Sequence, residues 1–288
     1  MASTRQLKSR IRSVKNTRQI TKAMELVAAS KMRRAQEASQ ATSLYSQAAR
    51  ELLTRLAELA DTKAHVLFRE RPIQNRLLIV ITSDKGLAGA YNSNILKTYA
   101  QQLKTDADNG VSSRTITIGR KGAQFVSRIK DAETVGAYQD FPERPTGNEL
   151  RPILTTIVDQ FISGEIDAVD VVYTHYINSI TQIATVQRVL PAGFKETEVS
   201  AEVQNAEFEP SVTEVLEKTA VRLIEAQLFQ ALLDSVASEH SMRMVAMKNA
   251  TDNASDLIGD LTLEMNKVRQ AAITQELAEI SGGVEAMK

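Results

Sequence analysis

The chain has 288 residues, enough for one large domain or two modest ones with a sizeable core. Its 35 basic and 35 acidic residues give zero net charge, which argues against a polyanion-binding protein, and the lack of Cys excludes disulfides, thiolate metal sites and a cysteine nucleophile. The longest apolar run, residues 77–81, is far shorter than the roughly 20 residues of a membrane span, and no secretory signal begins the chain. We therefore expect a soluble, intracellular-type protein.

Glycine and proline divide the chain into three parts. All six Pro and nine of the twelve Gly lie between positions 72 and 210, and from 211 to 281 the only such residue is Gly259. A Gly in a helix interior costs about 1 kcal/mol relative to Ala, so long segments without it favour helices. We predict an N-terminal coiled-coil helix over 1–71, an α/β middle domain over 72–210 and a C-terminal coiled-coil helix over 211–288.

The first and last parts carry a helical repeat of mostly apolar residues. Positions spaced alternately by three and four run from Ala35 to Leu59 and from Leu216 to Ala272, and Gly282 and Gly283 are expected to end the second helix. A sustained repeat of this kind predicts a left-handed coiled coil, antiparallel here because the middle part must carry the chain back. Four polar residues in the second stripe are predicted to be seam residues that set its register: Thr219, Gln230, His240 and Thr251.

The middle part alternates apolar runs with helical patterns. We expect strands over 77–82, 115–118, 169–174 and 182–190, and helices over 91–104, 121–129 and 149–162. Alternation of this kind predicts a small sheet with helices on its faces. The expected fold is therefore a long antiparallel coiled coil of the N- and C-terminal helices, with a small Rossmann-like α/β domain inserted between them.

The clearest turn in the middle part, SDKGLAGAYN at residues 83–92, follows a strand and opens a helix, which is where phosphates often bind. It lacks the order of residues of a P-loop and the three glycines of a dinucleotide site, so a tight turn that needs Gly86 and Gly89 is the better interpretation. The three His residues are scattered, without the spacing of a metal site. We predict no catalytic, cofactor or metal site.

Charge is distributed unevenly between the two ends. Residues 1–34 hold ten Lys or Arg and one acidic residue, whereas residues 207–288 hold fourteen acidic and seven basic residues. A basic helix suggests nucleic acid or an anionic membrane, but residues 1–44 contain no aromatic residue for base stacking. The basic face is either solvated and partly neutralised by the acidic helix, or it faces an acidic protein surface.

Two other classes of function stay open from the residues alone. One is a coiled-coil protein that binds nucleic acid through its basic N-terminal helix, with a steep dependence on salt. The other is an α/β enzyme with a helical arm, whose turn at 83–92 binds a phosphorylated ligand. Such an enzyme needs a general base or a metal near the turn, where the sequence offers only Asp84 and Lys85.

Three segments resemble the gamma subunit of rotary (F-type) ATP synthases. Residues 5–36 are similar to its N-terminal helix, and TSDKGLAGAYN at 82–92 resembles its D-[RK]-G-L-C-G segment, with Ala88 where Cys is common. Residues 243–280 are similar to its C-terminal helix. The family signature there is carried by Ile273, Thr274, Glu276, Glu279 and Gly283, and the chain departs from it with Val284 in place of Ala.

The resemblance implies a non-catalytic role. In that family the paired terminal helices form a central shaft inside a ring of three alpha and three beta catalytic subunits, and the middle domain forms part of the foot on the membrane ring of c subunits. The shaft transmits torque between proton flow and ATP synthesis. The implied partners are the alpha, beta and epsilon subunits and the c ring, with no cofactor, no nucleic acid and no membrane span of its own.

The resemblance also implies subunit contacts for seven residues. Met24 would face the lever loop of a beta subunit, with Arg243 coupled to it, and Lys85 would contact the acidic part of that lever. Glu209 would face the polar loops of the rotor ring. The catch loop of a beta subunit would be contacted by three residues of the upper shaft: Arg269, Gln270 and Thr274.

The resemblance also bears on the location of the protein. A chain without Cys cannot carry the redox switch of the chloroplast form, and the family motif begins too early to leave room for a transit peptide. We expect a peripheral protein at the cytoplasmic face of a bacterial plasma membrane, with a mature mitochondrial chain as the alternative.

Overall fold

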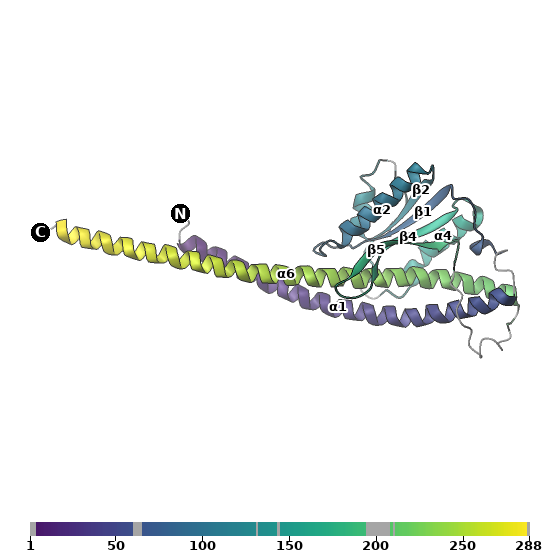
Figure 1. The fold of residues 1–288 in the computed structure, drawn as a ribbon, viewed down its shortest axis with the longest axis horizontal. Coiled ribbons are helices and arrows are strands. Elements are labelled where there is room, and N and C mark those ends of the chain that lie inside the picture. The colour runs from purple at the N-terminus through teal and green to yellow at the C-terminus, as the bar shows by residue number, and fades with distance from the viewer. Residues whose placement is uncertain are drawn as a thin grey trace. The chain divides into compact units, whose positions relative to one another are not determined.

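The computed structural model describes residues 4–59, 65–130, 132–142, 145–193, 208–209 and 211–286. Two helices dominate it, α1 (Thr4–Leu59) and α6 (Val212–Ala286). The chain forms two compact units, and both helices contribute to each (Figure 1). We call Met1–Ala28 with Arg243–Lys288 the coil unit, and Ala29–Met242 the sheet unit.

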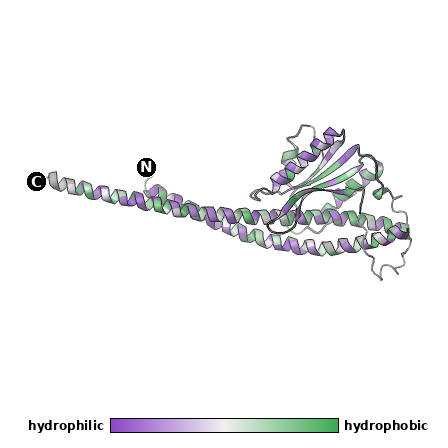
Figure 2. Cartoon of the chain, viewed as in Figure 1, coloured by the Kyte–Doolittle hydropathy of each residue, from purple (hydrophilic) through white to green (hydrophobic). Residues whose placement is uncertain are grey.

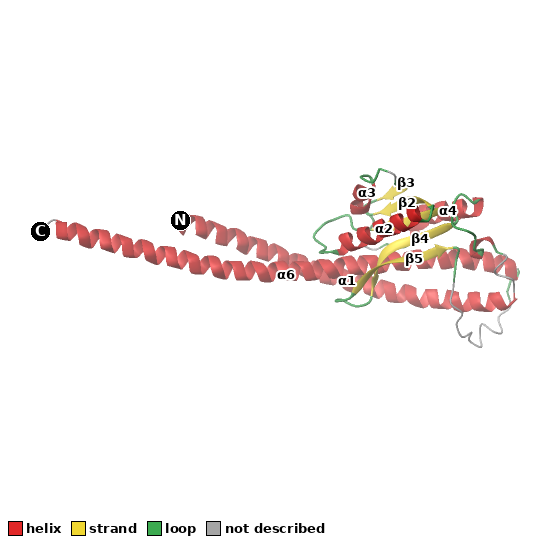
Figure 3. Cartoon of the chain, turned by 45° about the horizontal axis from the view of Figure 1, so that its top comes forward, coloured by secondary structure: helices red, strands yellow, loops and turns green. Residues whose placement is uncertain are grey.

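The sheet unit contains a five-stranded sheet in the order β3-β2-β1-β4-β5 (Figure 3). β1 pairs in parallel with β2 and β4, β2 pairs in parallel with β3, and β5 pairs antiparallel with β4. The strands are β1 (Asn75–Ile81), β2 (Ser112–Ile118), β3 (Glu133–Tyr138), β4 (Ala168–Tyr176) and β5 (Gln182–Leu190). The predicted Rossmann-like sheet between two long helices is confirmed.

Helices cover both faces of this sheet because its central strand is apolar on both sides. Successive side chains of a strand point to opposite faces. Leu78 and Val80 pack in one core with α2 (Tyr91–Asp108), whereas Leu77 and Ile79 pack in another with α4 (Arg151–Ser163) and α6. The short helix α3 (Arg120–Val126) follows β2. The second face is completed by five residues of α6: Ala220, Ile224, Leu228, Ala231 and Leu232.

The two long helices pack on each other within each unit. In the sheet unit, Leu53 and Leu56 of α1 share a core with Leu223 of α6. In the coil unit, Leu7 of α1 packs with Leu261 of α6, which is the predicted antiparallel pairing. Figure 2 shows hydrophilic and hydrophobic residues alternating along both helices, as an amphipathic repeat requires.

Thr251 and Gln230 of α6, both predicted as polar seam residues, bond to α1. In the coil unit, the hydroxyl groups of Thr21 and Thr251 are 2.8 Å apart, and in the sheet unit the Gln230 amide donates to Ser39 Oγ at 2.7 Å. Directional bonds of this kind fix the register of two helices, which apolar contacts alone leave less specified.

The structure differs from several of the expected elements. The N-terminal helix, predicted over 1–71, is described only to Leu59, and a separate 3-10 helix lies at Val66–Phe68. Strand β3 was not predicted, because Gly136 and exposed residues leave it without a clear alternation. The expected helix over 121–129 ends at Val126. Helix α6 continues through Gly282 and Gly283 to Ala286, so the predicted stop is wrong. Gly lowers helix stability by about 1 kcal/mol a residue but leaves the backbone hydrogen bonds intact.

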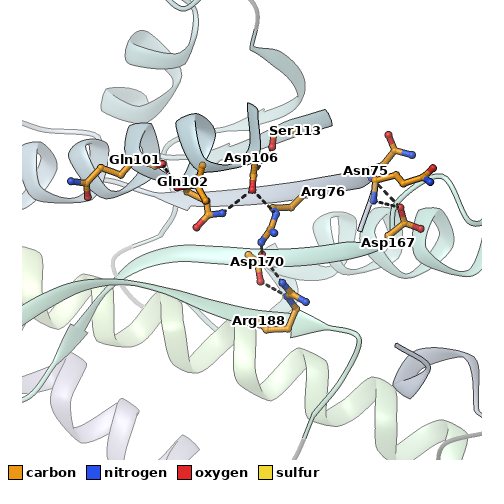
Figure 4. Close-up of polar contacts among 11 residues, drawn as sticks. Asn75, Arg76, Gln101, Gln102, Asp106, Ser113, Asp167, Asp170 and Arg188 are labelled. Atoms are coloured by element: carbon orange, nitrogen blue, oxygen red, sulfur yellow. Dashed lines mark hydrogen bonds and ion pairs between the residues drawn. The ribbon is translucent and has the colours of Figure 1, made fainter. Parts of the chain in front are cut away.

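Four charged side chains form a row that runs from α2 across β1 and β4 to β5 (Figure 4). Arg76 lies 3.2 Å from Asp106 of α2 and also pairs with Asp170 of β4. Asp170 in turn accepts from Arg188 of β5 at 2.5 Å, and Asp106 accepts from Ser113 Oγ at 2.7 Å. Both carboxylates are buried, so each depends on these partners.

Candidate functional site

The turn after β1 is held by its own hydrogen bonds. The Asn92 side chain, in the first turn of α2, accepts from the Ser83 backbone N–H at 3.1 Å and donates to Ser83 Oγ at 2.8 Å. Ser83 Oγ also donates to the Lys85 carbonyl at 2.7 Å. These contacts close a compact turn at the carboxyl end of a parallel strand, the edge where α/β sheets present their loops.

Asp84 links this turn to the ends of the two neighbouring strands. One carboxylate oxygen accepts the Arg120 backbone N–H at 2.9 Å, and the other accepts the Asp140 backbone N–H at 3.1 Å. The carboxylate therefore joins the ends of β1, β2 and β3. The geometry gives Asp84 a structural role at this edge of the sheet.

Lys85 and Leu87 present the outer surface of the same turn. Lys85 is exposed, and Leu87 is 62% exposed with φ at 63°, a left-handed conformation that non-Gly residues rarely adopt. Gly89 follows with φ at 56°. The side chains of Lys85 and Leu87 are therefore both accessible at this surface.

In the coil unit, the basic residues of α1 lie on its exposed side. Leu7 and Ile11 face the core, whereas Arg5, Lys8 and Arg12 are exposed. The predicted contact residues Met24 of α1 and Arg243 of α6 are both half-buried in this unit.

The last described turns of α6 carry the three predicted catch-loop residues. Arg269, Gln270 and Thr274 are exposed, and Thr274 Oγ1 donates to the Gln270 carbonyl at 2.9 Å. Gln270 and Thr274 are four residues apart and share one face of the helix. Ile273 and Leu277 are also exposed, at 49% and 63%, so this segment presents apolar as well as polar side chains.

The structure does not gather the seven predicted contact residues into one site. Lys85 and Glu209 belong to the sheet unit, and the other five belong to the coil unit. Glu209 is exposed shortly before α6 begins at Val212. Their roles as subunit contacts stay predictions.

Sequence reasoning missed a group of polar residues around Asp234, a buried carboxylate of α6. Its partners are Ser39 of α1, Gln230 of α6 and His175 of β4. The one signal in the sequence is an acidic residue inside the apolar segment ALLDSVA. Gln230 is one turn away in the same helix, but Ser39 and His175 lie far away along the chain. We call these four residues the Asp234 joint.

Among the described residues, no group of three or more His, Asp or Glu side chains is placed to hold a metal ion. Within the same ranges, no helix has the length and apolar character needed to cross a membrane.

Comparison with known proteins gives a consistent set of similarities. The family model described as ATP synthase matches residues 3–287. The chain is 42% identical over 288 residues to the ATP synthase gamma chain of Stenotrophomonas maltophilia strain R551-3, and 42% identical over 292 residues to that of Ralstonia nicotianae. Both alignments cover the whole of each chain.

Solved structures give the same fold. The chain superimposes on a chain of the central stalk and c ring of the Tetrahymena thermophila mitochondrial ATP synthase, with a TM-score of 0.61, 25% identity and coverage of 80% of this chain and 99% of that one. A chain of the Euglena gracilis mitochondrial ATP synthase gives a TM-score of 0.67 at 18% identity, covering 99% and 94%.

Proposed function

The chain belongs to the ATP synthase gamma-chain family, and from this membership we propose that it is the central rotor shaft of a bacterial ATP synthase. The gamma chain is a non-catalytic subunit of that enzyme. The observation that carries the proposal is the match along the whole chain, at 42% identity, to bacterial gamma chains. The two long helices and the inserted sheet fit the same role.

A shaft works by making different contacts with equivalent partners. Three identical catalytic sites around an asymmetric helix pair meet different side chains at any one rotor angle. A contact between the shaft and a catalytic site shifts that site between its open and closed states only if the shaft binds the two states with different free energies. Rotation would therefore couple ion flow through the membrane ring to ATP synthesis in the head.

The seven contact residues are part of this proposal. Arg269, Gln270 and Thr274 would meet the catch loop of a beta subunit, which their exposure at the end of α6 supports. Met24, Arg243 and Lys85 would meet its lever. Lys85 offers a compact charge rather than the bidentate fork of Arg, so its contact with a carboxylate would depend less on orientation.

The foot of the rotor belongs to the same proposal. Glu209 would face the ring of c subunits, and the epsilon subunit would bind beside it. The three parts predicted from Gly and Pro, over 1–71, 72–210 and 211–288, would then correspond to the first helix, the foot and the second helix of the rotor. We place the protein at the cytoplasmic face of the bacterial plasma membrane, as a peripheral subunit, on the strength of its bacterial relatives.

Reconstitution tests the proposal directly. The chain is co-expressed with the alpha and beta subunits of one bacterial enzyme, and the purified material is assayed for subunit ratio and ATP hydrolysis. The expected product is a complex of three alpha, three beta and one copy of this chain, with cooperative turnover. A chain that purifies alone would contradict the shaft role, and nucleic-acid binding with a steep salt dependence would favour the rival based on the basic helix.

A further inference from the structure

The Asp234 joint brings three elements of the sheet unit to one buried carboxylate. Asp234 has a side chain only 6% exposed. Its Oδ1 accepts from Ser39 Oγ of α1 at 3.0 Å and from Gln230 Nε2, one turn earlier in α6, at 2.9 Å. Its Oδ2 lies 2.8 Å from Nδ1 of His175 in β4. A carboxylate so placed is an acceptor for strong, directional hydrogen bonds.

The environment of the carboxylate strengthens these bonds. Burial, and secondly the charge of Asp234, raise the pKa of Tyr173 to about 12. The Tyr173 hydroxyl donates to Gln187 Oε1 of β5 at 2.7 Å. Electrostatic interactions act over longer distances where water is excluded, so the loss of one partner of Asp234 is felt by the others.

Apolar packing alone does not fix how α1 is rotated and shifted along α6, and the hydrogen bonds of the Asp234 joint add that constraint. Ala49, Leu53 and Leu56 of α1 pack on α6, and such contacts are non-directional, so they resist separation better than rotation or sliding. The joint adds directional bonds to α6, and Gln36 Nε2 of α1 donates to the Tyr176 hydroxyl of β4 at 2.5 Å.

Serine residues of α6 continue the joint along β4. The pairing of β1 with β4 ends at Val172, so β1 does not extend beside Thr174. Instead Ser235 Oγ accepts the Thr174 N–H at 3.2 Å, and Ser238 Oγ donates to the Thr174 carbonyl at 3.3 Å. Ser235 and Ser238 are both buried. Through these two hydrogen bonds, helix α6 takes the place of a neighbouring strand.

We propose that Asp234 is a positioning residue of the rotor, which holds α1 and β4 on α6 so that the sheet turns together with both long helices. The inference rests on the proposed function, because it assigns the joint to the transmission of torque. Torque applied to the sheet reaches α6 through an apolar core and reaches α1 through α6 and the joint. Weakening the joint should therefore matter most when the rotor works against a load.

The test uses membrane vesicles that carry the whole ATP synthase with this chain as its gamma subunit. Two variants weaken the joint, Ser39→Ala and Asp234→Asn. The control is Ser113→Ala, which also removes a serine hydroxyl bonded to a buried Asp, but inside the α/β part of the sheet unit. Two rates are measured: ATP hydrolysis with the proton gradient collapsed, and ATP-driven proton pumping against a gradient.

We expect Ser39→Ala and Asp234→Asn to lower proton pumping per ATP hydrolysed by about twofold or more, because each loses a hydrogen bond to or from a buried charge. The rate of ATP hydrolysis with the gradient collapsed should stay near that of the unsubstituted chain in both variants. In the control Ser113→Ala, both measured rates should stay near those of the unsubstituted chain. The double variant should be no worse than Asp234→Asn alone, since the two residues share one interaction. Ser39→Thr, which keeps the hydroxyl, should restore the ratio.

Equal pumping ratios in all variants would overturn the inference. So would an equal loss in Ser113→Ala, because it would indicate general loosening of the sheet unit. A failure of the unsubstituted chain to assemble or to support pumping would instead contradict the proposed function itself.

Discussion

Arg76 lies between two buried carboxylates, and its removal should destabilise the protein strongly. The side chains of Asp106 and Asp170 are only 2% and 3% exposed. Arg76→Met keeps much of the side-chain volume but leaves both carboxylates short of a positive charge. Breaking a buried ion pair on one side costs about 3 to 5 kcal/mol. We expect a loss near the lower end of that range in urea unfolding, because Arg188 still pairs with Asp170.

Arg120→Met is the matched control at the surface. Arg120 pairs with Asp140 at 3.1 Å, with side chains 47% and 74% exposed. Exposed ion pairs contribute about 0 to 1 kcal/mol, so this variant should change the free energy of unfolding little. Similar losses in the two variants would show that burial of Asp106 and Asp170 is not the cause.

At the scale of elements, the small residues of the helix seam are as important as the large ones. Ala254 of α6 is 8% exposed in the coil unit, so Ala254→Leu inserts three carbon atoms where there is little space. Overpacking of this kind costs about 1 to 3 kcal/mol. We expect a lower urea midpoint for the chain.

Ala271→Leu, at an exposed position of the same helix, separates packing from helix propensity. Leu is nearly as good a helix former as Ala, so this variant should change the free energy of unfolding by less than about 0.5 kcal/mol and leave the urea midpoint nearly unchanged. If Ala254→Leu is equally neutral, the seam is not closely packed at that position.

The elements were predictable where one physical signal dominated. Leu77–Ile81 reads as a buried strand because five consecutive apolar residues follow Arg76, and the absence of Gly and Pro reveals both long helices. Strand β3 was missed because it is an edge strand with a Gly and exposed side chains, held mainly by backbone bonds to β2. Hydrophobic patterns do not report such bonds.

The predicted contact residues could be proposed from the sequence, whereas the Asp234 joint could not. Lys85 and Arg269 could be proposed because each lies in a continuous segment that resembles a family motif. The Asp234 joint could not, since Ser39, His175 and Asp234 are far apart in sequence and meet only when α1, β4 and α6 pack. A single acidic residue in an apolar segment indicates a buried partner but does not identify it.

At the scale of the whole molecule, the end of α6 can be tested apart from the fold. The last core residue of the coil unit is Val268, and residues 269–281 are exposed. Truncation from Arg269 onward therefore removes the predicted catch-loop contacts, and none of the side chains described over 269–281 belongs to the core. We expect the urea midpoint of the isolated chain to stay the same, while ATP synthesis by the complex falls about tenfold, the effect of roughly 1.4 kcal/mol of lost contact free energy.

A shorter truncation that removes residues 281–288 is the control, because it keeps Arg269, Gln270 and Thr274. It should retain most of the synthesis rate if those three residues carry the contact. Equal losses in both truncations would place the contact beyond Ile280 instead. If the longer truncation leaves synthesis unchanged, the upper end of α6 transmits no torque, and coupling must pass through the lever contacts proposed for Met24, Lys85 and Arg243.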